Sequence, residues 1–198
     1  MQNVGIEKAH YIGAEGRVSV LRVFAGGGMA RAGLGDEWQC LLANDVAPVK
    51  TDAYKAKWGA EHLDTRDIVK LLPEDLPARA DLAWASFPCQ DLSIAGNGRG
   101  IGKAGPGATR SGVLWPFLDL IARLRIERRQ PSVLVLENVT GLLTSNSGND
   151  FSAICCAMVR LGYHFGAVMI YAKHFVPQSR PRIFIIAVRA DVPFTSEK

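Results

Sequence analysis

Short apolar runs rich in β-branched residues alternate with helix-patterned segments along almost the whole chain. The strand-like runs occupy residues 18–24, 40–45, 81–86, 132–138 and 166–172. Segments with apolar residues three and four positions apart lie between them, at residues 52–59, 111–129 and 150–162. Because this alternation is typical of βαβ units, it predicts an α/β fold with a mostly parallel sheet and helices on both faces.

The last two strand-like runs, "GAVMIYAKHF" and "RPRIFIIAV", lie close together in the sequence. Parallel neighbours need a crossover connection of about a dozen residues or more, whereas antiparallel neighbours need only a turn. The sequence therefore predicts a C-terminal antiparallel hairpin that closes the sheet.

The length of 198 residues and the hydrophobic fraction of 48% are sufficient for one domain with a sizeable core. We expect this domain to span residues 18–190, after an N-terminal extension (1–17) and before a C-terminal tail (191–198). The formal net charge of +4 permits a polyanionic partner without requiring one. The N-terminal residues contain no apolar region of signal-peptide length, and no apolar run in the sequence is long enough to span a bilayer, so we expect a cytoplasmic protein.

The four cysteines show neither CxxC spacing nor a nearby histidine cluster, which argues against a structural zinc site or a disulfide framework. Cys40, Cys155 and Cys156 lie inside apolar stretches, and we expect them to be small buried side chains. Cys89 differs, because it follows Pro88 at the end of a strand-like run and precedes polar residues in "SFPCQDLS". It is the candidate nucleophile.

A glycine-rich stretch, "FAGGGMARAGLG", follows the first strand-like run directly. Ligands bind at the carboxyl ends of strands in a parallel sheet, and glycines let the backbone approach a ligand closely. Asp45, at the end of the second strand, is placed to accept hydrogen bonds from a ribose. The third glycine of the dinucleotide pattern falls at Arg31, so the predicted nucleoside cofactor need not carry a pyrophosphate. A glycine-rich turn without a ligand is the alternative.

A second glycine-rich stretch, residues 93–112, carries Arg99, Lys103 and Arg110. A loop of this length in a compact domain is typically a functional lid or a disordered segment. Its "GIGKAG" does not form a phosphate-binding P-loop, because Asn97 replaces the required glycine and Ala104 the required hydroxyl.

Two further strand ends carry reactive groups. Glu137 ends a very apolar strand, where a carboxyl partly shielded from water can carry a proton near neutrality. Arg180 and Arg182 alternate in "QSRPRIF" and would point to one face of an extended chain, although an exposed basic strand start is an equal alternative. A thiol, such a carboxyl, a guanidinium pair and a nucleoside pocket together predict covalent catalysis on a small planar substrate.

The segments "FAGGG", "DTRDI", "FPCQDLS", "RSGVLWPFL", "ENV" and "QSRPRIF" resemble, in order and spacing, the motifs of the DNA cytosine-5 methyltransferases. The resemblance runs from about Val18 to Val188. It implies a Rossmann-like S-adenosylmethionine-dependent methyltransferase fold, DNA as the partner, and a place among enzymes of restriction-modification systems.

The resemblance also implies roles for individual residues. Cys89 would be the nucleophile, Glu137 would act at ring nitrogen 3 of cytosine, and Arg182 would contact the cytosine carbonyl. Asp45 would bind the ribose of S-adenosylmethionine, and Asp67 with Ile68 would meet its adenine. The remaining implied cofactor contacts are Phe24, Gly26, Gly28 and Leu114. The residues implied to lie near the DNA or to support the site are Gln90, Ser93, Gln178 and Arg180, and Arg180 is also implied to belong to the catalytic group.

The chain departs from the family pattern at three places. Arg22 stands where the family usually has an acidic residue, and Asp45 where it commonly has glutamate. The target-recognition region and the final conserved segment of the family have no counterpart in the sequence. We therefore expect a fragment, a decayed copy, or one subunit of a split enzyme that needs a second polypeptide. An inactive DNA- or partner-binding remnant is one alternative. A nicotinamide-dependent oxidoreductase is another, although it would not need Cys89.

Overall fold

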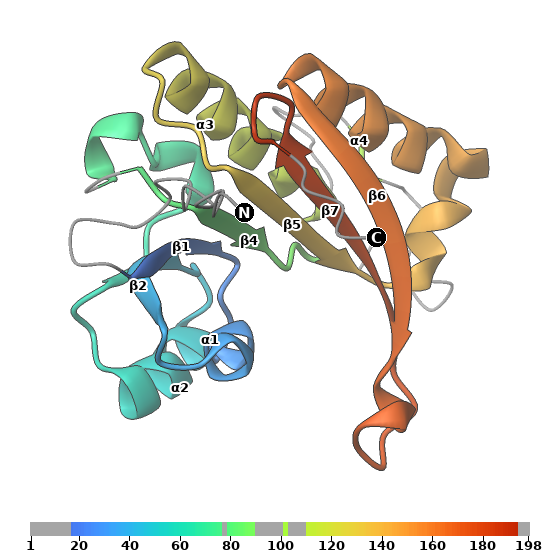
Figure 1. The fold of residues 1–198 in the computed structure, drawn as a ribbon. Helices are drawn as coiled ribbons and strands as arrows, with labels where there is room; N and C mark the ends of the chain where they lie inside the picture. The colour runs from blue at the N-terminus through green and yellow to red at the C-terminus, as the bar shows by residue number, and fades with distance from the viewer. Residues whose placement is uncertain (1–16, 77–78, 90–100, 103–109, 194–198) are drawn as a thin grey trace, which may run out of the picture.

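The computed structural model describes residues 17–76, 79–89, 101–102 and 110–193. Within these residues, strands form one sheet in the order β3-β2-β1-β4-β5-β7-β6 (Figure 1). The strands are β1 (Val18–Val23), β2 (Trp38–Asn44), β3 (Leu63–Asp64), β4 (Leu82–Ala85), β5 (Val133–Asn138), β6 (Tyr163–Tyr171) and β7 (Pro181–Arg189). The first five strands pair in parallel, and β7 pairs antiparallel with both β5 and β6. The predicted parallel sheet with a C-terminal antiparallel hairpin is confirmed.

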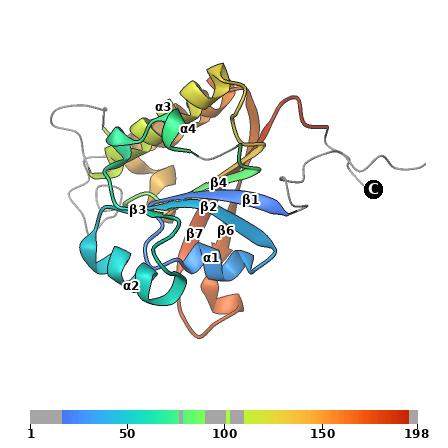
Figure 2. The ribbon, with the colours of Figure 1, turned by 90° about the vertical axis from the view of Figure 1, so that its left-hand side faces the viewer.

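Helices cover both faces of this sheet, as the alternating pattern predicts. Figure 2 shows α3 and α4 on one side and α1 and α2 on the other. The helices are α1 (Met29–Leu34), α2 (Pro48–Trp58), α3 (Leu114–Ile126) and α4 (Asn149–Arg160). Short 3-10 turns connect the elements at Ile68–Lys70 (η1), Pro73–Asp75 (η2), Arg110–Val113 (η3), Thr140–Leu143 (η4), Ser145–Gly148 (η5) and Ala172–His174 (η6). In the described part of the chain, no helix combines the length and apolarity that crossing a bilayer requires.

The main core lies between the sheet and the α3–α4 layer. Phe117, Ile121 and Leu124 of α3 are almost fully buried, and Ile154 and Met158 of α4 are completely buried. This spacing of three and four residues is the helical periodicity that the sequence showed. The core fixes the strands whose carboxyl ends form the site described below.

The cysteines of α4 correct one expectation. Cys40 is buried in β2, as expected, but Cys155 is only partly buried and Cys156 is exposed. The buried face of α4 is defined by Ile154 and Met158, and Cys156 lies between them in sequence on a different side of the helix. An apolar neighbourhood in sequence therefore did not determine burial here.

The predicted extension (1–17) and tail (191–198) fall largely outside the described residues, so this division of the chain remains a prediction. The basic positions Arg99 and Lys103 of the second glycine-rich stretch also lie outside them, as does the side chain of Arg110.

Candidate active site

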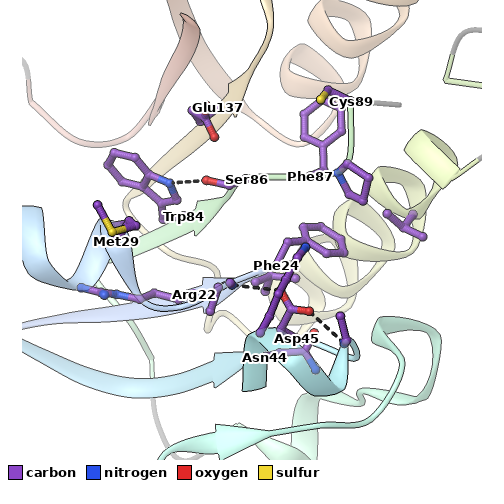
Figure 3. A pocket seen from close by; sticks show the side chains of 18 of the residues that line it. Arg22, Phe24, Met29, Asn44, Asp45, Trp84, Ser86, Phe87, Cys89 and Glu137 are labelled. Carbon is purple, nitrogen blue, oxygen red and sulfur yellow. Dashed lines mark hydrogen bonds and ion pairs between the residues drawn. The ribbon is translucent and has the colours of Figure 1, made fainter. Parts of the chain in front are cut away.

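A cavity of about 820 Å³ lies at the carboxyl ends of β1, β2, β4 and β5, beside the start of β7. Its wall brings together most residues that the sequence singled out (Figure 3). These are Phe24, Gly26, Asp45, Asp67, Ile68, Cys89, Glu137, Arg180 and Arg182. The cavity therefore has a glycine-loop side and a side that carries the thiol, the carboxyl and the arginines.

Asp45 shapes the glycine loop as well as lining the cavity. Its Oδ2 accepts a hydrogen bond from the Gly26 amide at 2.9 Å, and its Oδ1 accepts one from the Ala47 amide at 3.0 Å. Gly26 has a φ of 57°, and a Cβ added to it would meet no atom within 4 Å. Because the backbone at Gly26 faces open space, a ligand can approach it closely.

Asp67 and Ile68 form the neighbouring part of the wall at the start of η1. The Asp67 carboxylate caps this turn by accepting a hydrogen bond from the Val69 amide at 3.1 Å. Ile68 is buried and offers the cavity an apolar surface. Together they suit a flat ring that has both an apolar face and polar edges.

Glu137 and Arg182 form an ion pair, with 3.0 Å between Arg182 Nε and Glu137 Oε1. Each side chain is 19% exposed, and both line the cavity. The antiparallel pairing of β5 with β7 brings them together, since Glu137 lies opposite Phe184, two residues from Arg182. Sequence reasoning gave the two residues separate contacts, whereas the structure makes them one charged unit.

The Cys89 segment is held in place by Asn138, to which sequence reasoning assigned no role. The buried Asn138 amide donates to the Phe87 carbonyl at 3.0 Å, and its oxygen accepts from the Val139 amide at 2.8 Å. Asn138 thereby couples the strand end that carries Glu137 to the segment that carries Cys89. Its position next to Glu137 in "ENV" was the available signal.

Trp84 and Ser86 are two further wall residues that sequence reasoning missed. Trp84 Nε1 donates to Ser86 Oγ at 3.0 Å. Trp84 and Ser86 are two residues apart at the end of β4, so their side chains lie on the same face of the sheet. Their position at a strand end was the sequence signal that could have predicted them as site residues.

Several predicted residues do not line the cavity. Gly28 has a φ of 85° and packs against Trp58, and Leu114 is completely buried in the core while its neighbour Val113 reaches the cavity. Gln178 is exposed in the connection between β6 and β7. Gln90 and Ser93 lie outside the described residues.

Comparison with known proteins relates this arrangement to one family. Residues 18–198 match the family described as C-5 cytosine-specific DNA methylase. The type II methyltransferase M.BsuFI of Bacillus subtilis is 30% identical over 178 residues, which cover 89% of this chain and 40% of that protein. M.NgoBI, a type II methyltransferase of Neisseria gonorrhoeae, is 29% identical over 175 residues, or 87% of this chain and 51% of that protein.

The fold has the same relationship to solved structures. The Dnmt2 methyltransferase of S. pombe superposes with a TM-score of 0.70 at 22% identity, over 90% of this chain and 53% of that chain. This likeness shows a shared fold. The chain thus spans about half, or less, of the length of the relatives that it matches.

Proposed function

The chain belongs to the C-5 cytosine-specific DNA methylases. We propose that residues 18–190 form the catalytic region of an enzyme that methylates carbon 5 of cytosine in DNA. The proposed methyl donor is S-adenosylmethionine. One observation carries the proposal. A single cavity is lined by Cys89 and the Glu137–Arg182 pair on one side and by Gly26 and Asp45 on the other. A nucleophile and a nucleoside-binding loop therefore face the same space.

The glycine-loop side fits the nucleoside part of the cofactor. Asp45 keeps acceptor capacity beyond its two backbone hydrogen bonds, because an ionised carboxylate has about four lone-pair sites. We assign it to the ribose hydroxyls, Asp67 and Ile68 to the adenine, and Phe24 and Gly26 to the cavity floor. When bound, S-adenosylmethionine supplies an electrophilic methyl group at a sulfonium centre.

The opposite side fits the chemistry of the base. Carbon 5 of cytosine is a weak nucleophile, but addition of the Cys89 thiolate to carbon 6 pushes an electron pair onto carbon 5. In the ligand-free site Glu137 and Arg182 are paired with each other. When the base enters, the Arg182 guanidinium turns to the carbonyl oxygen and Glu137 acts as the acid at ring nitrogen 3, so both relieve the negative charge on the ring. After methylation, loss of the proton from carbon 5 restores the ring double bond and expels the thiolate.

A base stacked in a duplex hides carbon 6, so the cytosine must be flipped into the cavity. Arg180 lines the cavity and Gln178 is exposed nearby in sequence, and we assign both to the DNA backbone. Because the chain spans 40% and 51% of two type II relatives, we propose that reading the base sequence requires polypeptide beyond these 198 residues, in the same protein or a second one.

The test is covalent trapping on random-sequence duplex DNA that contains 5-fluorocytosine, in the presence of S-adenosylmethionine. Fluorine at carbon 5 blocks the final elimination, so we expect a stable protein–DNA adduct. Cys89→Ser should abolish the adduct, whereas the matched control Cys156→Ser, which changes an exposed thiol on α4, should retain it. An adduct formed by Cys89→Ser would refute the assignment of the nucleophile. Cofactor binding without any adduct, even after the remaining polypeptide of the enzyme is supplied, would instead favour an inactive binding remnant.

A further inference from the structure

Arg22 is a buried cation without a hydrogen-bond partner, and it lines the candidate active site. Its residue exposure is 1%, and none of its three guanidinium nitrogens, Nε, Nη1 and Nη2, has a partner among the described residues. The residue belongs to the wall of the same cavity as Gly26 and Asp45. Buried polar groups in proteins are normally paired, so an unpaired guanidinium at a cavity needs an explanation.

Within the described part of the chain, the groups around Arg22 do not supply an anion. Arg22 lies on the sheet face that α1 covers, since its neighbour on that face, Val20, packs with Leu34. Cys40 and Tyr54 would attract the Arg22 guanidinium only if they were ionised, and the positive charge of Arg31 repels it. The Tyr54 hydroxyl already accepts a hydrogen bond from Arg31 Nη1 at 2.8 Å. Burial is the main cause that lowers the pKa of Arg22, and the repulsion from Arg31 acts in the same direction, whereas Cys40 and Tyr54 act weakly in the opposite one.

The nearby carboxylate of Asp45 is also engaged elsewhere. Its oxygens accept from the Gly26 and Ala47 amides, and its cationic neighbour is Lys50, at 3.8 Å. Arginine stays protonated in proteins, so Arg22 cannot escape its burial by losing a proton. Ligand-free protein therefore holds a charge whose natural partner is a planar anion, which a guanidinium binds through two parallel hydrogen bonds.

We propose that Arg22 binds the carboxylate of the amino-acid part of the S-adenosyl cofactor. This inference rests on the proposed function, and it assigns a contact to a position where the family usually has an acidic residue. Figure 3 shows Arg22 on β1 and Asp45 just after the end of β2, with Arg22 running toward the side of the cavity where Met29 and Trp84 lie. Asp45 thus holds the nucleoside and Arg22 the opposite end of the ligand. Met29, at the start of α1, lines the same cavity and is 81% exposed.

The test compares two ligands by calorimetry on the whole chain. One is S-adenosylhomocysteine, and the other is 5′-(3-aminopropylthio)-5′-deoxyadenosine, which lacks only the carboxylate. We expect the wild-type chain to prefer the carboxylate-bearing ligand by about tenfold or more, as a charge-assisted hydrogen bond provides. Arg22→Met should abolish this preference and leave the affinity for the decarboxylated ligand within about threefold of wild type.

A matched control and a second variant separate binding from folding. Arg189 is a mostly buried arginine with partners, Asp191 and the Gln130 carbonyl, at the far end of β7. Arg189→Met should lower the melting temperature and keep the ligand preference. Arg22→Met should raise the melting temperature of the ligand-free chain, because it removes an unpaired buried charge. Arg22→Lys keeps the positive charge but not the two parallel N–H donors of a guanidinium, so it should retain only part of the preference for the carboxylate-bearing ligand.

The outcomes distinguish this inference from the proposed function. If both ligands bind and Arg22→Met leaves their ratio unchanged, or weakens both equally, the inference is wrong and the nucleoside pocket stands. If wild type binds neither ligand, the proposed function fails, and the inference fails with it. If inorganic phosphate stabilises wild type but not Arg22→Met while the ligand ratio is close to one, Arg22 binds a free anion and the cofactor carboxylate is excluded.

Discussion

Gly28 offers the sharpest test of how the glycine loop is built. Its φ is +85°, and a Cβ added there would lie 2.3 Å from Trp58 Nε1 and 2.7 Å from Trp58 Cδ1. A left-handed conformation costs a residue with a Cβ about 1–2 kcal/mol. Forcing an extra carbon into a packed site costs about 1–3 kcal/mol more. Gly28→Ala should therefore lower the free energy of unfolding by about 2–5 kcal/mol.

Gly26→Ala is the matched control in the same loop. Gly26 also has a positive φ, +57°, but a Cβ there would meet no atom within 4 Å. Only the backbone strain applies, so we expect a loss of about 1–2 kcal/mol. Because Gly26 lines the cavity and Gly28 does not, Gly26→Ala should instead reduce the affinity for S-adenosylhomocysteine.

The free energy of unfolding of both variants is measured by urea denaturation, monitored by far-UV circular dichroism. Equal losses of stability for Gly28→Ala and Gly26→Ala would refute the argument, since the steric contact with Trp58 is their main difference. A double-mutant cycle with Trp58→Leu isolates that contact, because residues in contact show coupling of about 0.5–3 kcal/mol. The extra cost of Gly28→Ala should shrink in the Trp58→Leu background.

The sequence predicted the long elements of the fold because their periodicity reflects burial directly. It missed β3, since two residues cannot show a period, and α1, whose six residues include Gly33 and follow a glycine run. Helix propensity there is weak, and the packing of Leu34 beside Trp38 and Val20 compensates for it. Such short elements depend on tertiary contacts that no local pattern encodes.

The candidate site was predictable where a residue's position at a strand end determined its place. Asp45, Cys89 and Glu137 follow or end three strands whose carboxyl ends meet at one edge, and all three line the cavity. The position of Leu114 depends instead on the phase of a helix. One residue rotates a side chain by about 100°, which puts Val113 at the cavity and Leu114 in the core.

Pairings between distant side chains could not be predicted in the same way. The contact between Glu137 and Arg182 depends on the register of β5 with β7, which the sequence does not specify. The unpaired state of Arg22 depends on what α1 and α2 bring to the same face of the sheet. The sequence showed Arg22 only as a departure from the family pattern. The structure shows that its side chain is buried and that its guanidinium has no hydrogen-bond partner among the described residues.

Three further predictions concern single side chains. Glu137→Gln should slow labelled methyl transfer by orders of magnitude and leave calorimetric binding of S-adenosylhomocysteine nearly unchanged, since the carboxyl acts on the base; an equal loss of both would indicate a structural role. Asn138→Ala leaves the Phe87 carbonyl and the Val139 amide without their partner, so urea unfolding should show a loss of about 1–3 kcal/mol, and an unchanged midpoint would contradict this. The last prediction concerns pH. Burial raises the pKa of Tyr163 to about 12, and its hydroxyl donates to the Pro131 carbonyl at 2.7 Å. The unfolded chain releases this proton first, near pH 10, so the folded state binds more protons above that pH and its stability falls as pH rises from about 10 to about 12. Tyr163→Phe should be less stable at pH 8 by about 0.5–1.5 kcal/mol, because it loses the hydrogen bond, yet it should lose less stability between pH 9 and 11 than wild type. An alkaline slope that is the same in both proteins would show that another group causes it.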